Sequence, residues 1–161
     1  MIVAAVIVLY DNDCGLCRWS MAWALRHDGR KRLVAVPIQS PLGAEVLAEL
    51  DEQERLRSAH VVDEHGARRS GGAAAADVLS ELAPTRALGR LASRAPAPTS
   101  LLYDFVATHR HGFGRFVRQR ARQRADELLG AASVRTAAEL DARSRTGGAP
   151  GDAGASAARP S

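Results

Sequence analysis

The sequence predicts an α/β fold, a three-layer sandwich with a mixed sheet in the order βαβαββα, followed by a helical extension. Residues 2–9 form an almost continuous β-branched and alanine run, typical of a strand covered on both faces. A second apolar run at 33–38 follows a long stretch without internal proline, and two short runs flank a glycine turn at Gly66. A parallel βαβ unit, an antiparallel hairpin and a closing helix give this architecture.

Each element has its own local signal. The first helix follows the polar turn at 11–13 and stops before Gly29, and the second has a proline in its first turn. Gly71 and Gly72 indicate a break before the last helix of the core. The expected elements are strand 2–9, helix 14–28, strand 33–38, helix 41–50, strands 60–63 and 67–70, and helix 73–82.

Beyond Pro84 the sequence predicts only helices, at 85–93, 99–109, 115–129 and 134–143. We therefore expect a core at residues 1–84, a helical extension at 85–145 that packs on it, and a disordered Gly, Ala, Pro and Ser tail at 146–161. We expect the extension to pack through its large apolar side chains, with its arginines facing water. These apolar residues are Leu101, Leu102, Phe105, Val106, Phe113 and Phe116.

Composition and charge exclude some classes of protein. No apolar run reaches the roughly 18 to 20 residues that cross a bilayer, and residues 1–9 lack the basic start of a secretory signal, so we expect a cytoplasmic protein. Residues 1–84 carry 9 basic and 12 acidic side chains, whereas 85–161 carry 13 and 6. The arginine-rich segment 109–124 could contact nucleic acid or an anionic membrane, but we favour a solvated surface.

The main chemical motif is Cys14-Gly15-Leu16-Cys17, which follows a buried strand and begins a helix. Free backbone N–H groups and the helix dipole favour a thiolate at Cys14, the expected nucleophile. Cys17 lies one turn further and can attack a mixed disulfide formed by Cys14, so it is the expected resolving thiol. Substrate contact is expected at the flanking residues Asp13, Gly15 and Leu16.

Other interpretations of this region stay open. The two cysteines could be half of a zinc site or an unreactive buried pair, although no second Cys-x-x-Cys completes four ligands. Asp11-Asn12-Asp13 after an apolar strand looks like the nucleophile motif of haloacid-dehalogenase-type phosphatases. That chemistry needs a downstream lysine, and Lys31 is the only lysine in the chain.

Charges near the cysteines act in opposite directions on the Cys14 pKa. Asp11 and Asp13 should raise it, while the helix start and Arg18 should lower it. Asp11 is also a candidate general base for the Cys17 proton, and a role as a turn-capping carboxylate fits it equally well.

Several segments together resemble the DCC family of thiol-disulfide oxidoreductases, which has a thioredoxin-like fold and an Asp-x-x-Cys-x-x-Cys motif. The resemblance covers roughly residues 3–118 and places the motif on Asp11, Cys14 and Cys17. The matching segments are Tyr10-Asp11-Asn12-Asp13-Cys14-Gly15-Leu16-Cys17, Val36-Pro37-Ile38-Gln39-Ser40, Val61-Val62-Asp63 with Gly66, and Leu102-Tyr103 with Arg110.

The chain departs from these patterns at two places. The family usually has glycine where this chain has Asn12, a residue that tolerates left-handed backbone conformations. Thioredoxins carry a cis-proline beside the cysteines, whereas residues 57–60 here contain no proline.

We therefore expect a thiol-disulfide oxidoreductase of the protein-disulfide reductase type. Its expected partners are a disulfide-containing protein or small molecule and an external thiol reductant. No cofactor and no metal is implied. The alternative is a redox-inert thioredoxin-like binding module that uses the basic helix.

Overall fold

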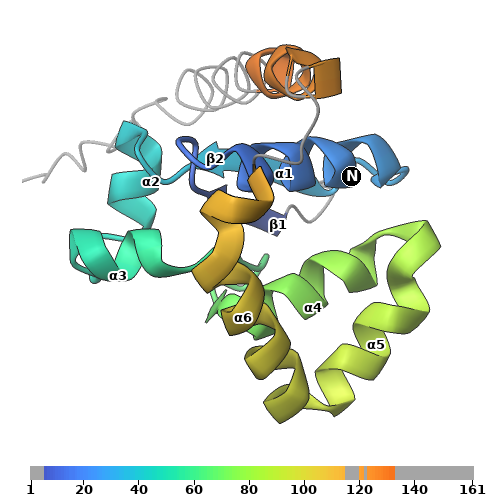
Figure 1. Ribbon diagram of the computed structural model, residues 1–161. Helices are drawn as coiled ribbons and strands as arrows, with labels where there is room; N and C mark the ends of the chain where they lie inside the picture. The colour runs from blue at the N-terminus through green and yellow to red at the C-terminus, as the bar shows by residue number, and fades with distance from the viewer. Residues whose placement is uncertain (1–5, 115–119, 122, 133–161) are drawn as a thin grey trace, which may run out of the picture.

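The computed structural model describes residues 6–114, 120–121 and 123–132 and folds into three layers, with a four-stranded sheet between two helical layers (Figure 1). The sheet order is β2-β1-β3-β4, with β1 parallel to β2 and antiparallel to β3. The elements are β1 Val6–Tyr10, α1 Gly15–His27, β2 Leu33–Pro37, α2 Pro41–Val46, α3 Glu52–Arg57, β3 His60–Val62, β4 Arg68–Ser70, α4 Gly71–Glu81, the 3₁₀ turn η1 Ala83–Thr85, α5 Arg86–Arg94 and α6 Pro96–Gly114.

The predicted α/β sandwich with a mixed sheet is confirmed, and it agrees with the thioredoxin-like fold that the resemblance implies. The predicted hairpin also forms: β3 and β4 pair in antiparallel register, and Gly66 in the turn has a φ of +79°. The side chain of Asp63 accepts hydrogen bonds from the N–H groups of His65 and Ala67, which fixes this turn.

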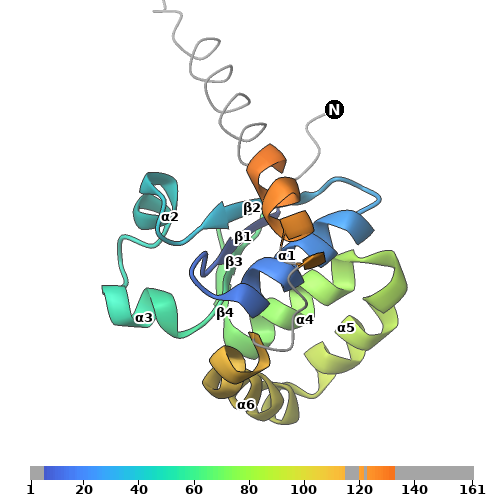
Figure 2. The ribbon, with the colours of Figure 1, turned by 45° about the horizontal axis from the view of Figure 1, so that its top comes forward.

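Alternate residues of the central strand supply two apolar cores. Val6, Val8 and Tyr10 face α1 and α4. Residues 125 and 129 of the helical segment 123–132 pack into the same core. Ile7 and Leu9 face the opposite layer, which contains α2 and α3. Figure 2 shows α2 and α3 on one side of the strands and α1, α4 and α5 on the other. Because both faces are covered, the end of β1 is a rigid platform for the turn that follows.

Two details of the core differ from the expectation. Helix α2 ends at Val46 rather than at residue 50, and the unpredicted helix α3 follows it. The signal for α3 was present in the sequence, because Asp51 and Glu54 form a capping box in which each side chain accepts the other residue's N–H.

The Gly71-Gly72 pair starts α4 and does not break the chain before it. A Cβ on Gly72 would lie 2.9 Å from Cα of Ser100, so glycine here allows α4 to approach α6 closely. With α6 held there, the hydroxyl of Tyr103 accepts the N–H of Ala59, the residue just before β3.

The predicted packing of the extension is partly wrong. Leu101, Leu102 and Phe105 are 72%, 67% and 56% exposed, because α6 contacts the rest of the fold through its opposite face, which carries Tyr103 and Arg110. Helix α6 also starts at Pro96 rather than at residue 99.

Some predictions concern parts of the chain that the structure does not describe. Residues 115–119 and 122 of the basic segment 109–124 lie outside the described residues, as do the helix expected at 134–143 and the tail at 146–161. The side chains of Phe113 and Phe116 are also not described. The division into a core, a docked extension and a tail stays a prediction. No helix in the described ranges is both long and apolar enough to span a bilayer.

Candidate active site at the end of the first strand

The turn after β1 is held by a network of short hydrogen bonds. Asp11 is buried, and its Oδ1 accepts hydrogen bonds from the N–H of Asp13 at 3.0 Å and from Nε2 of Gln39 at 2.7 Å. Oε1 of Gln39 in turn accepts the N–H of Asn12 at 3.1 Å. Gln39 follows β2, so the parallel pairing of β1 and β2 brings both loops to the same edge of the sheet. These hydrogen bonds therefore fix the position of the start of α1 relative to the sheet.

Cys14 is the N-cap residue of α1. Its backbone is extended, with φ of −91° and ψ of 110°, and its Sγ accepts the N–H of Cys17 at 3.3 Å. A sulfur in this position replaces the usual hydroxyl or carboxylate cap, and the helix dipole places partial positive charge beside it. The fold thus stabilises negative charge on Cys14.

The two thiols have pKa values displaced in opposite directions. The pKa of Cys14 is lowered to about 6, chiefly because the Cys17 thiol donates a hydrogen bond to it, and the Cys17 N–H and Arg110 lower it further. The pKa of Cys17 rises, first because of its hydrogen bond to Cys14 and then because of burial. The hydrogen bond between the two thiols could by itself stabilise a thiolate on either sulfur. The N–H of Cys17 donates only to the Cys14 sulfur, so it favours the thiolate at Cys14. The geometry gives one thiolate and one thiol near neutral pH.

The cation beside the sulfurs is Arg110, from α6. Its guanidinium lies 3.8 Å from the carboxylate of Asp11 and donates to the carbonyl of Leu56 at 3.0 Å. It lowers the pKa of both cysteines, whereas Asp11 raises both. The expectation that Arg18 does this is wrong, because Arg18 pairs with Asp126 in the segment 123–132. The expectation that Arg110 faces water is also wrong, since only 19% of its side chain is exposed.

A family model of the DCC1-like thiol-disulfide oxidoreductases matches residues 8–116, which is more than half of the chain and includes both cysteines, Gln39 and Arg110. This chain belongs to the DCC1-like thiol-disulfide oxidoreductase family. Neither the curated proteins nor the solved structures gave a match. Membership of this family points to a role in thiol-disulfide redox chemistry.

The DCC1-like assignment agrees with the position of the only lysine. Lys31 precedes β2, and Leu33 pairs with Val6 in the parallel register. Lys31 therefore lies at the N-terminal end of the parallel strands, whereas Asp11 follows their C-terminal end. The phosphatase interpretation needs a lysine beside the aspartate and therefore loses its support. Asp11 does carry out the turn-capping role, through its bond to the N–H of Asp13.

The residues expected to contact substrate lie around the pair but differ in exposure. Asp13 is exposed, while Gly15, Leu16 and Cys17 are half-buried. Cys14 is only 2% exposed. Exposure therefore favours Cys17 as the site of attack, whereas acidity favours Cys14. Because the thiolate is the reactive form of a cysteine, exposure and acidity point to different sulfurs.

The loop before β3 differs from that of thioredoxins, as the sequence indicated. No cis peptide bond occurs among the described residues. The N–H of Ala59 donates to the hydroxyl of Tyr103 at 2.8 Å, and its carbonyl accepts the N–H of Gly71 at 3.0 Å. Both backbone groups of this DCC1-like loop residue are thus used within the fold.

Sequence reasoning gave Gln39, Tyr103 and Arg110 no role in the site. Gln39 lies in the loop after β2, whereas Tyr103 and Arg110 lie on α6, and only tertiary structure brings these distant segments to the cysteines. Their one sequence signal was that all three belong to the segments that resemble the family.

Proposed function

We propose that this protein reduces disulfides through the Cys14–Cys17 dithiol, in the manner of a protein-disulfide reductase. The observation that carries the proposal is the hydrogen bond from the Cys17 N–H to the Cys14 sulfur, together with the opposite displacement of the two pKa values. The family match supports thiol-disulfide chemistry in general.

In the first step, the Cys14 thiolate attacks one sulfur of the substrate disulfide. A mixed disulfide with Cys14 forms, and the other substrate sulfur leaves as a thiolate that takes a proton from water. Formation of this bond removes the Cys14 negative charge, which is one of the causes that raise the Cys17 pKa. The resolving thiol therefore becomes more acidic when it is needed.

In the second step, Cys17 loses its proton and attacks the Cys14 sulfur, which releases the second substrate thiolate and leaves a Cys14–Cys17 disulfide. Asp11 is the proposed proton acceptor, since its charge acts on Cys17 from within the site. An external thiol then reduces the disulfide and is itself oxidised. We place this cycle in the cytoplasm, where such thiols are abundant.

Turnover tests the proposal. The protein should accelerate reduction of insulin by dithiothreitol, followed as precipitation of the free insulin B chain. Cys14→Ser and Cys17→Ser should each reduce the rate to the uncatalysed background, because either change removes the dithiol. Gly29→Ala is a suitable control, since a Cβ at this position meets no atom within 4 Å. Equal acceleration by the wild type and both cysteine variants would contradict a dithiol mechanism.

A further inference from the structure

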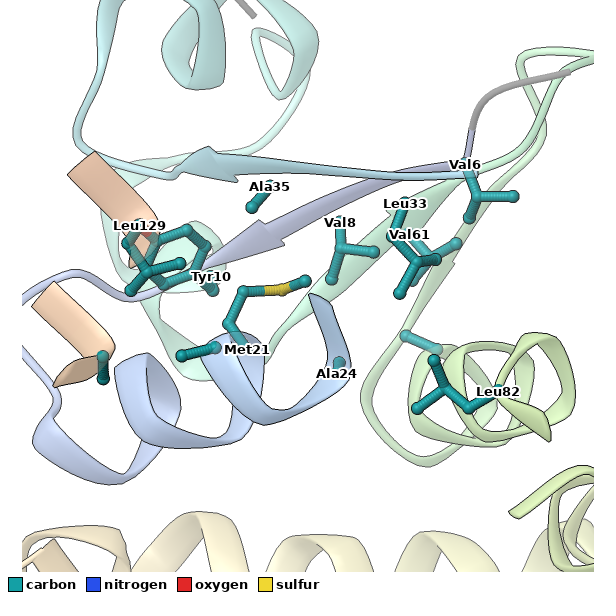
Figure 3. Packing of buried hydrophobic residues seen from close by; sticks show 13 residues of the cluster. Val6, Val8, Tyr10, Met21, Ala24, Leu33, Ala35, Val61, Leu82 and Leu129 are labelled. Carbon is teal, nitrogen blue, oxygen red and sulfur yellow. The ribbon is translucent and has the colours of Figure 1, made fainter. Parts of the chain in front are cut away.

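A cavity of about 350 Å³ lies between the sheet, α1, α4 and α6. Its floor includes Val8 and Val61 of the sheet, and its walls include Met21 and Leu82. Figure 3 shows these four side chains in the space between the strands and the helices. Most of the lining is apolar, so the cavity suits a hydrocarbon group better than a charged one.

One end of this cavity is the candidate active site. Cys17, Asp11 and Arg110 all contribute to the lining there. A group held at that end therefore lies beside Cys17, whose N–H donates to the Cys14 sulfur.

We propose that the cavity receives an apolar substituent of the disulfide substrate, so that the protein selects disulfides carrying an aromatic or branched alkyl group. This rests on the proposed function. The chemistry is the two-step exchange above, in which the disulfide gains two electrons and becomes two thiols while Cys14 and Cys17 become a disulfide.

The size of the cavity sets the size of the substituent. A protein cavity of about 150 Å³ holds one benzene molecule. The cavity here is more than twice that volume, so it accepts a benzyl group or a somewhat larger hydrocarbon.

The polar groups at the active-site end are already paired, which favours an apolar occupant. Arg110 is engaged by Asp11 and by the Leu56 carbonyl, and the backbone of Ala59 is bonded to Tyr103 and Gly71. A charged substituent would have to displace one of these partners, whereas a hydrocarbon displaces only water.

The first arm of the test measures single-turnover oxidation of the reduced protein by two disulfides. Bis(2-hydroxyethyl) disulfide is hydrophilic, and benzyl 2-hydroxyethyl disulfide differs by one apolar group. Each rate constant is divided by that of dithiothreitol with the same disulfide, which removes intrinsic reactivity. Burial of a benzyl group should favour the benzyl disulfide by about tenfold to a hundredfold.

Two phenylalanine variants of α4 provide the matched comparison. Ala75 is half-buried and lines the cavity, whereas Ala73 is exposed on the same helix and does not line it. Ala75→Phe should bring the ratio of the two normalised rates close to one, and Ala73→Phe should leave the ratio as in the wild type. Ala75→Leu fills the cavity less and serves if the larger variant unfolds.

The second arm needs no redox chemistry. Trp19 and Trp23 both line the cavity and are the only tryptophans in the chain. Benzyl 2-hydroxyethyl sulfide, which has no disulfide to reduce, should shift their fluorescence to shorter wavelength in the wild type and in Ala73→Phe but not in Ala75→Phe.

Equal normalised rates for the two disulfides in the wild type would overturn the inference. A fluorescence shift that is absent in the wild type, or that survives in Ala75→Phe, would overturn it as well. If neither disulfide oxidises the protein, the proposed function itself fails, and the fluorescence arm still shows whether the cavity binds the apolar group.

Discussion

Cys17→Ser, mixed in reduced form with a disulfide, is expected to accumulate one covalent adduct on Cys14. The Cys14 thiolate still attacks, because the helix N-terminus and the N–H of residue 17 remain to stabilise it. Serine cannot displace the bound substrate sulfur, so the mixed disulfide persists. Intact-mass measurement gives the stoichiometry, and peptide mapping gives the site.

Cys14→Ser is expected to form almost no adduct over the same time. Its remaining thiol has a raised pKa in the wild type, and much of that rise depends on Cys14, so the variant keeps an ordinary or poorly acidic thiol. Trapping by Cys14→Ser at the rate of Cys17→Ser would exchange the two assigned roles. It would also mean that the greater exposure of Cys17 outweighs the acidity of Cys14.

Alkylation of the reduced wild type by iodoacetamide is expected to follow a titration at Cys14 with a midpoint near pH 6. The rate should be low below this pH, where the thiol is protonated, and should reach a plateau above pH 7, where the thiolate predominates. An unperturbed cysteine reaches its midpoint only at about pH 8.5. Because Cys14 is 2% exposed, the plateau should lie below that of a free thiolate.

Mass spectrometry of the peptides that contain Cys14 and Cys17 measures how much of each thiol is alkylated at each pH. In denatured protein, both thiols should show a midpoint near pH 8.5.

Arg110→Gln should move the Cys14 midpoint upward, because the positive charge of Arg110 lowers this pKa. Arg18→Gln is the matched control, since Arg18 pairs with Asp126 and is not among the causes of the shift. Faster labelling of Cys17 than of Cys14 near neutral pH would contradict the assignment.

The core of the fold could be predicted from the sequence because its signals are local. The apolar run of β1, the helix signals of α1 and the Gly66 turn are each short-range, and together they predict the succession of strands and helices along the chain. The position of Cys14 at the start of α1 could be predicted in the same way. The strand ends before Asp11, and only a short polar turn separates the strand from α1.

The rest of the site depends on tertiary contacts, which local patterns do not contain. Arg110 belongs to an arginine-rich segment that suggests a solvated surface, yet the contact of α6 with α4 at Gly72 carries it to Asp11. The same contact explains the error about α6. Periodicity showed that Leu101, Leu102 and Phe105 share one face of the helix, but the sheet-side contacts use Tyr103 and Arg110 on the opposite face.

A redox titration tests the central claim, that Cys14 and Cys17 form one reversible dithiol. The protein is equilibrated with graded ratios of reduced and oxidised dithiothreitol, and its remaining thiols are alkylated and counted by mass spectrometry. We expect both thiols to disappear together in one two-electron transition within the monomer, with a tenfold change in the ratio of the two forms for about every 30 mV. Two thiols that stay free at every ratio, or a single thiol lost by forming a dimer between chains, would contradict the account.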